Sequence, residues 1–175
     1  MERTEGHYDM SNRKIITILL KQLLEKKIDK RGNYWAKEVT FNYGYPEECR
    51  VDYMKFEPQN NSPSGLEKGI FICYEIKSSV EDFRSHSGHN FLGEKNYYVM
   101  PVEVYLKTQK EIPFSIGVYC PIPNRKTIEQ ELESPTDIYK ITPNSCEIFC
   151  IKKARSINRK YSNLTCLFNM FRSGK

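Results

Sequence analysis

The stretch FICYEIKSS, residues 71–79, places a carboxylate at Glu75 and an amine at Lys77 directly after a strongly apolar run. In an extended strand, side chains two positions apart point to the same face, so these two charged groups project together. Asp52 lies in an earlier strand-like run, from which its carboxylate can reach Glu75. Two neighbouring carboxylates repel, and one takes up a proton unless a cation joins them. The spacing is therefore typical either of an ion pair at a strand end or of half of a metal site.

These groups suit the hydrolysis of a phosphodiester bond. Mg²⁺ prefers oxygen ligands and keeps several water molecules, which makes Asp52, Glu75 and the carbonyl of Ile76 candidate ligands. A bound cation lowers the pKa of a water molecule and polarises a phosphate group. Lys77 beside such a site can orient the attacking water and offset charge on the transition state. The sequence therefore predicts a catalytic site that depends on Mg²⁺ or Mn²⁺, although the pattern alone is short enough to occur by chance.

The groups need a sheet to bring them together, and the sequence predicts one. Residues 12–28 place isoleucines and leucines at helical spacing, which is typical of an amphipathic helix. The turn-forming segment NYGYPE joins two strands into a hairpin, and the apolar run 69–77 suits a central strand covered on both faces. The other expected segments are hairpin strands 34–41 and 48–57, a polar loop 58–69, helices 78–86 and 101–112, and strands 96–101 and 115–121. This order predicts an α/β sandwich with a central mixed sheet flanked by helices.

The C-terminal part is expected to add a small hairpin and a basic helix. Segments 138–142 and 146–154 have the composition of paired strands, and residues 159–172 have a helical pattern. The apolar side chains expected to point inward from that helix are Leu164, Leu167, Phe168 and Phe171. A length of 175 residues predicts one domain over 1–175, with its core at about 12–121 and the hairpin and basic helix within 122–175.

Charge and cysteine usage narrow the class of protein. The net charge is +5, and residues 151–175 hold seven basic side chains and no acidic one. Such a segment favours a polyanion or an acidic protein surface as partner, while a solvated helix face explains it equally well. No apolar stretch is long enough to span a membrane, and the N-terminal segment does not have the pattern of a signal peptide. The six cysteines form no CxxC pair, so we expect free thiols in a cytoplasmic protein.

The motifs VDYM and CYEIKSSVEDF resemble those of the PD-(D/E)xK nuclease superfamily. Within it, residues 35–121 are similar to MmcB-type DNA repair proteins and to related small phage or prophage nucleases. The resemblance implies a restriction-endonuclease-like fold and a DNA endonuclease or nickase that leaves a 5′-phosphate and a 3′-hydroxyl, in DNA repair or phage DNA processing. It also implies Asp52 and Glu75 as metal ligands, Lys77 as the catalytic lysine and Glu38 as an additional upstream carboxylate. A surface position on its strand is the alternative for Glu38.

Several further residues are candidate contacts to DNA, and each has a simpler alternative. Hydroxyl groups after the motif can hold a phosphate or cap a helix, the histidines lie in a loop near the site, and the basic tail can follow a phosphate backbone or face solvent. The candidates are Ser78, Ser79, His86, His89, Lys95, Lys152, Lys153, Arg155, Arg159 and Lys160.

The sequence leaves other functions open. A non-catalytic DNA-binding or adaptor protein that keeps the nuclease fold is one alternative, and an inhibitor whose basic tail docks on an acidic partner is another. Many nucleases of this class pair two subunits to cut two strands, so a homodimer is a further expectation.

Overall fold

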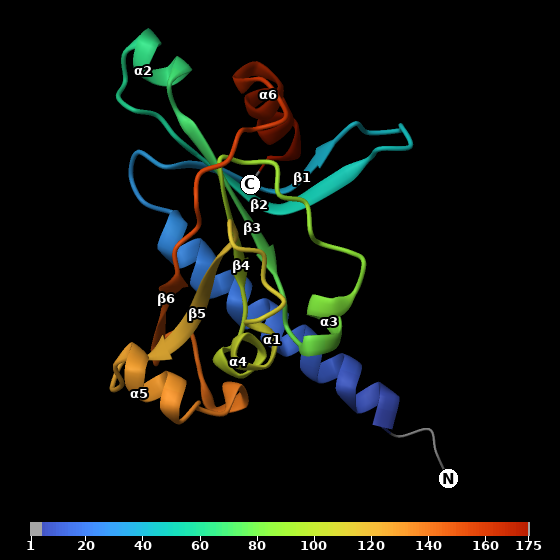
Figure 1. Ribbon diagram of the computed structural model, residues 1–175, viewed down its shortest axis with the longest axis vertical. Coiled ribbons are helices and arrows are strands. Elements are labelled where there is room, and N and C mark those ends of the chain that lie inside the picture. The colour runs from blue at the N-terminus through green and yellow to red at the C-terminus, as the bar shows by residue number, and fades with distance from the viewer. Residues whose placement is uncertain (1–4, 175) are drawn as a thin grey trace.

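The computed structural model describes residues 5–174, and their side chains from residue 13 onward. At its centre is one sheet of six strands in the order β1-β2-β3-β4-β5-β6 (Figure 1). The strands are β1 (Tyr34–Phe41), β2 (Cys49–Glu57), β3 (Ile70–Ile76), β4 (Lys95–Val99), β5 (Gly117–Pro123) and β6 (Cys146–Lys152). The pairs β3–β4 and β4–β5 are parallel, and the other neighbours are antiparallel. The expected α/β fold with a mixed sheet between helices is confirmed.

Helices cover both faces of this sheet. They are α1 (Glu5–Ile28), α2 (Pro63–Glu67), α3 (Val80–Arg84), α4 (Val102–Thr108), α5 (Ile128–Glu133) and α6 (Asn163–Ser173), with a 3₁₀ turn η1 at Ile138–Lys140. The leucines and isoleucines of α1 pack on one face of the sheet. The opposite face is covered by α6 over β1 to β3 and by α3, α4 and α5 over β4 and β5. None of the described helices is long and apolar enough to cross a membrane.

The central strand and the hairpin that hold the motif lie where the sequence predicts them. In β3, residues Phe71 to Ile76 are all buried, which fits a strand with helices on both of its faces. The strands β1 and β2 form the expected antiparallel hairpin. Helix α3 begins at Val80, four residues after β3 ends at Ile76, because the Ser79 side chain accepts a hydrogen bond from the Asp82 amide and caps it. The chain therefore turns sharply at the end of β3, next to the E-x-K motif.

The prediction of a terminal hairpin is wrong. Residues 138–140 form η1 instead of a strand, because the Asp137 side chain accepts a hydrogen bond from the Tyr139 amide at 3.1 Å and caps a turn. The partner of β6 is β5, and their antiparallel register runs from Val118–Lys152 to Pro123–Cys146. The open edge of β5 gives β6 a longer ladder of hydrogen bonds than the short segment 138–142 offers.

The inward face expected for the last helix is also wrong. The buried side chains of α6 are Cys166, Asn169 and Met170. The four apolar side chains expected to point inward face solvent instead. Their exposed fractions are 78% for Leu164, 37% for Leu167, 56% for Phe168 and 86% for Phe171. A polar contact holds α6 in this orientation. The side-chain amide of Asn163, at the start of the helix, donates a hydrogen bond to the carbonyl of Glu67 at 2.7 Å.

Candidate active site

Three carboxylates lie in a row across β1, β2 and β3. The pairs Lys37–Tyr53 and Val39–Val51 flank the position at which Glu38 faces Asp52. One step beyond the pair Tyr53–Tyr74, the register places Asp52 beside Glu75. Residues directly opposite each other in a sheet share a face, so the fold brings these acids together as the sequence predicts.

Glu75 is the most unusual of them. Its side chain is fully buried, and neither carboxylate oxygen makes a hydrogen bond with the described residues. Burial and the negative charge of Asp52 raise its pKa to about 9, while the charge of Lys77 and the backbone amide of Asn90 oppose the rise. In the absence of a cation, Glu75 is therefore a neutral acid at neutral pH.

Asp52 is tied to the end of the central strand. Its Oδ2 accepts a hydrogen bond from the Ile76 amide at 2.8 Å. Burial raises the pKa of Asp52, and the hydrogen bond from Ile76 opposes that rise. The bond spans the ends of β2 and β3 and fixes the position of the carboxylate.

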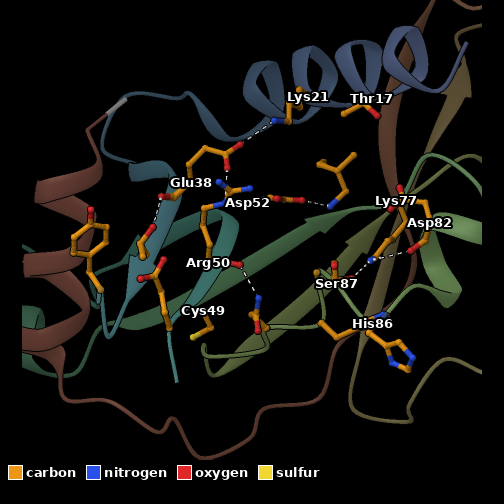
Figure 2. Close-up of a pocket in the computed structure, with 17 residues that line it drawn as sticks. Thr17, Lys21, Glu38, Cys49, Arg50, Asp52, Lys77, Asp82, His86 and Ser87 are labelled. Atoms are coloured by element: carbon orange, nitrogen blue, oxygen red, sulfur yellow. Dashed lines mark hydrogen bonds and ion pairs between the residues drawn. The ribbon is translucent and has the colours of Figure 1, made fainter. Parts of the chain in front are cut away.

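Lys77 is buried and held by backbone carbonyls. Its Nζ donates hydrogen bonds to the carbonyl of Ser87 at 2.6 Å and to that of Asp82 at 3.2 Å (Figure 2). Burial lowers the pKa of Lys77, and the charges of Asp82 and Glu75 oppose this shift. The ammonium group is thus oriented by the loop after α3, next to the carboxyl group of Glu75.

Gly88 closes that loop over the charged pair. Its φ of +68° lies in the left-handed region, and an added Cβ would stand 3.0 Å from Lys77 Nζ and 3.2 Å from Glu75 Oε2. Both the backbone conformation and the space therefore favour glycine at this position. The sequence reasoning did not single out Gly88, although a glycine between two histidines in a loop is a signal for such a close approach.

A cavity of about 1000 Å³ opens beside these residues. The middle of α1, the β1–β2 hairpin, the end of β3 and the loop 86–90 form its walls (Figure 2). Asp52, Ile76 and Lys77 line the cavity, whereas Glu75 lies behind this lining layer. A ligand in the cavity would meet Asp52 and Lys77 first.

Glu38 also lines the cavity and has two cationic partners there. Its backbone φ is +54°, and its carboxylate oxygens lie 3.0 Å from Lys21 Nζ and 2.9 Å from Arg50 Nε. These ion pairs neutralise much of the charge of Glu38. Lys21 and Arg50 were not foreseen, since a lysine on an amphipathic helix and an arginine on a hairpin carry no local signal of a site.

The serines after the motif act as caps in this structure. The amide and hydroxyl of Ser78 both donate to Asp82 Oδ2, at 2.8 and 3.1 Å. Ser79 accepts from the Asp82 amide at 3.1 Å. The helix-capping alternative thus describes their contacts, and neither serine lines the cavity.

The two histidines both line the cavity but differ in their surroundings. His86 is exposed, and Figure 2 shows its ring at the edge of the site. The ring nitrogens of His89 lie 2.5 Å from the Tyr98 hydroxyl and 2.8 Å from the Ser85 carbonyl. The contacts of His89 order the loop, whereas His86 remains available to a ligand.

Most of the predicted basic contacts lie away from this cavity. Lys95 lines a different cavity, and Lys152 donates to the carbonyl of Pro113 at 2.8 Å. Arg159 pairs with Glu94 at 3.2 Å, and the guanidinium of Arg155 stacks over Phe114 at 3.5 Å. Lys153 is exposed and does not line the cavity either.

Two residues of the basic tail approach the site, Lys160 and Arg172, and Arg172 lies over the ring of the lining residue Tyr43 at 5.6 Å. Burial raises the pKa of the Cys49 thiol at the cavity wall, and the nearby charge of Lys160 opposes that rise. Lys160 is exposed, so its ammonium group is accessible at this rim.

The donor groups fit a hard divalent cation. Within residues 13–174, no three His, Cys, Asp or Glu side chains gather as a ready set of metal ligands. Two carboxylates and a backbone carbonyl, completed by water, are nevertheless a donor set of the kind that Mg²⁺ accepts. The unpartnered oxygens of buried Glu75 are the feature of this structure that fits such a cation.

Comparison of the chain with protein-family models, with curated proteins and with solved structures yields no match.

Proposed function

We propose that this protein is a divalent-metal-dependent DNA endonuclease or nickase with a restriction-endonuclease-like sandwich fold. The observation that carries the proposal is the buried carboxyl group of Glu75, which has no hydrogen-bond partner and lies beside Asp52 and Lys77. Such a group is costly in a folded protein unless it serves a function. The order of strands, with a hairpin followed by two parallel connections, supports the same fold proposal.

In this proposal Asp52, Glu75 and the carbonyl of Ile76 hold Mg²⁺ or Mn²⁺. The bound cation would supply an acidified water molecule and polarise the scissile phosphate. Lys77, fixed by the carbonyls of Ser87 and Asp82, orients the attacking water and faces the charge that develops on the phosphate. Burial lowers its pKa, which makes proton exchange with water easier than for an ordinary lysine.

DNA is the proposed substrate because the cavity is wide and has cationic side chains at its wall and rim. Lys21 and Arg50 line it, and Lys160 stands near Cys49. These side chains suit the phosphates on either side of a scissile bond. The proposed setting is DNA repair or the processing of phage DNA.

A non-catalytic DNA-binding or adaptor protein is the second candidate, and two observations favour it. Glu75 is completely buried behind the cavity lining, and Gly88 lies against its Oε2. The carboxylate of Glu38 is already paired with Lys21 and Arg50. A protein that has lost its metal would keep such a closed arrangement.

Metal binding separates the two candidates before any cleavage is measured. We expect Mn²⁺ to raise the melting temperature of the wild-type protein above its value in EDTA, and Asp52→Asn to abolish the increase. The control is Glu81→Gln, which removes an exposed carboxylate with 69% of its side chain accessible. An equal response in all three proteins would remove the support for a cation at this site.

Cleavage then tests the reaction itself. Supercoiled plasmid, branched DNA and RNA are incubated with the protein in Mn²⁺ or in EDTA, beside the Lys77→Ala variant. Metal-dependent cutting of DNA that Lys77→Ala abolishes supports the nuclease. DNA binding without cutting, equal in wild type and Lys77→Ala, establishes the adaptor instead.

A further inference from the structure

A second cavity, of about 420 Å³, lies where β3 and β4 begin and α1 ends. It shares no lining residue with the candidate active site. Lys27 and Ile28 of α1, and Lys30 and Asn33 just after it, form one wall. The other wall is the face of the sheet that α1 covers elsewhere. The function of this cavity can therefore be considered separately from that of the carboxylate site.

Positive charge dominates the walls of this cavity. Lys27, Lys30, Lys55 and Lys95 line it, and among the described lining residues Glu57 is the one acid. Glu57 Oε1 lies 2.5 Å from Lys55 Nζ, so its charge is already matched. The ion pairs of the described side chains include none with Lys27, Lys30 or Lys95. Lys27 Nζ lies over the ring of Phe149 at 5.8 Å. The three lysines thus carry charge that no carboxylate balances around one half-open cavity, which favours an anion.

Three tyrosines on neighbouring strands form the floor of the cavity. The rings of Tyr74 and Tyr97 stack with their centroids 5.7 Å apart, and the rings of Tyr97 and Tyr119 meet edge to face at 4.9 Å. Tyr74 is 4% exposed, and no hydrogen bond joins its hydroxyl to another described residue. Burial raises the pKa of Tyr74, so the hydroxyl stays protonated and can donate a hydrogen bond to a ligand.

We propose that this cavity binds a small anion that carries several phosphate groups, the chemistry shared by inorganic polyphosphate and nucleoside triphosphates. Three ammonium groups without a carboxylate partner favour a ligand with several negative charges over one with a single carboxylate. Lysine ammonium and tyrosine hydroxyl groups both donate to phosphate oxygens. The volume of about 420 Å³ lies in the range of small-ligand sites.

Calorimetric titration with tripolyphosphate, with ATP and with a short single-stranded DNA tests this proposal. EDTA is present, so that the carboxylate site holds no cation. We expect tripolyphosphate and ATP to bind, Lys95→Gln to weaken their binding by about tenfold, and Tyr74→Phe to weaken it measurably. Tighter binding of ATP than of tripolyphosphate assigns the site to nucleotides, and equal binding assigns it to the phosphate chain alone.

A matched variant separates a defined site from general attraction by a basic protein. Lys110→Gln removes an exposed lysine that lines neither cavity, and its binding should equal that of the wild type. Equal weakening by Lys95→Gln and Lys110→Gln, binding of DNA alone, or no binding of either phosphate ligand would overturn the proposal. Circular dichroism checks that each variant is folded, and Lys30→Gln, which changes an exposed lysine at the same wall, replaces Lys95→Gln if the latter unfolds.

Discussion

The carboxyl group of Glu75 sets the pH dependence that we expect of the metal-free protein. Its pKa rises from 4.5 to about 9 on folding, so the folded state binds more protons than the unfolded state between these values. The free energy of unfolding should therefore fall as the pH rises from about 5 to about 9, with a slope of at most about 1.4 kcal/mol per pH unit from this group. Urea denaturation in EDTA measures this pH dependence, and Glu75→Gln should give a flatter profile of unfolding free energy against pH. Parallel profiles would contradict the assignment.

Gly88 allows a second experiment at the scale of one residue. Gly88→Ala places a methyl group 3.0 Å from Lys77 Nζ and adds strain at a φ of +68°. We expect a loss of roughly 2–3 kcal/mol in the free energy of unfolding, together with a weaker response to Mn²⁺. Thermal and urea denaturation measure both effects.

Gly32 provides the control for that substitution. Its φ is +86°, but nothing lies within 4 Å of an added Cβ. Gly32→Ala should therefore lose only the cost of backbone strain, about 1 kcal/mol, and leave the metal response unchanged. If both variants lose the same stability and respond equally to Mn²⁺, Gly88 does not protect the charged pair.

Residue types and strand periodicity were enough to predict Asp52, Glu75 and Lys77 as neighbours. The period of two in a strand puts Glu75 and Lys77 together, and the antiparallel pairing of β2 with β3 brings Asp52 alongside Glu75. The partners Lys21 and Arg50 could not be predicted, because they depend on how α1 docks on the sheet. The same holds for the burial of Glu75 behind the cavity lining, which a linear sequence does not contain.

At the scale of elements, α6 shows that apolar residues at helical spacing do not by themselves indicate which face of a helix is buried. Helical spacing shows that the apolar side chains share one face, but it does not show whether this chain covers that face. Phe171 is 86% exposed and Met170 is 7% exposed. We therefore expect Phe171→Ala to change the free energy of unfolding by less than about 0.5 kcal/mol, and Met170→Ala to reduce it by about 2–4 kcal/mol. Urea denaturation distinguishes this orientation of α6 from the inward orientation expected from sequence, which would reverse the two results.

The positions of the strands were easier to predict from the sequence than the pairing between them. A strand is visible in local composition, whereas its neighbour is decided by which edge of the sheet is free. The segment 138–142 looked like the partner of 146–154 because it is close in sequence. The open edge of β5 instead takes β6, and only the three-dimensional structure reveals that edge.

At the scale of the whole molecule, the segment 153–162 connects one end of the sheet to α6 and is fixed along its path. The amide of Arg155 donates to the carbonyl of Ser115, and that of Ile157 donates to the carbonyl of Glu94. Arg159 lies over the ring of Phe71 at 4.8 Å and pairs with Glu94 at 3.2 Å. This basic segment is therefore bound to the protein for much of its length.

We accordingly expect substitutions of Arg159 and Lys160 to differ sharply in their effects on stability and on DNA binding. Arg159→Gln should reduce the free energy of unfolding by roughly 2–4 kcal/mol, because it leaves the half-buried carboxylate of Glu94 without its partner. Lys160→Gln should cost less than about 0.5 kcal/mol, since Lys160 is exposed. In DNA-binding assays the order should reverse, with Lys160→Gln weakening binding more than Arg159→Gln does when both variants are folded. Equal stability losses would show that the segment is not fixed in this way.

The order of strands in the sheet has a consequence for how the chain is made. Because β1 to β6 are neighbours in the order in which they occur along the chain, each strand leaves the ribosome with its first partner already synthesised. The sheet can therefore grow from one edge during translation, because each new strand pairs with the strand that precedes it in the chain. Helix α6 is the exception, since it packs on β1 and covers the oldest part of the sheet last. Until residues 163–173 have been synthesised, the nascent hairpin exposes the apolar side chains that α6 later buries, and a chaperone that binds extended apolar segments would act at this stage.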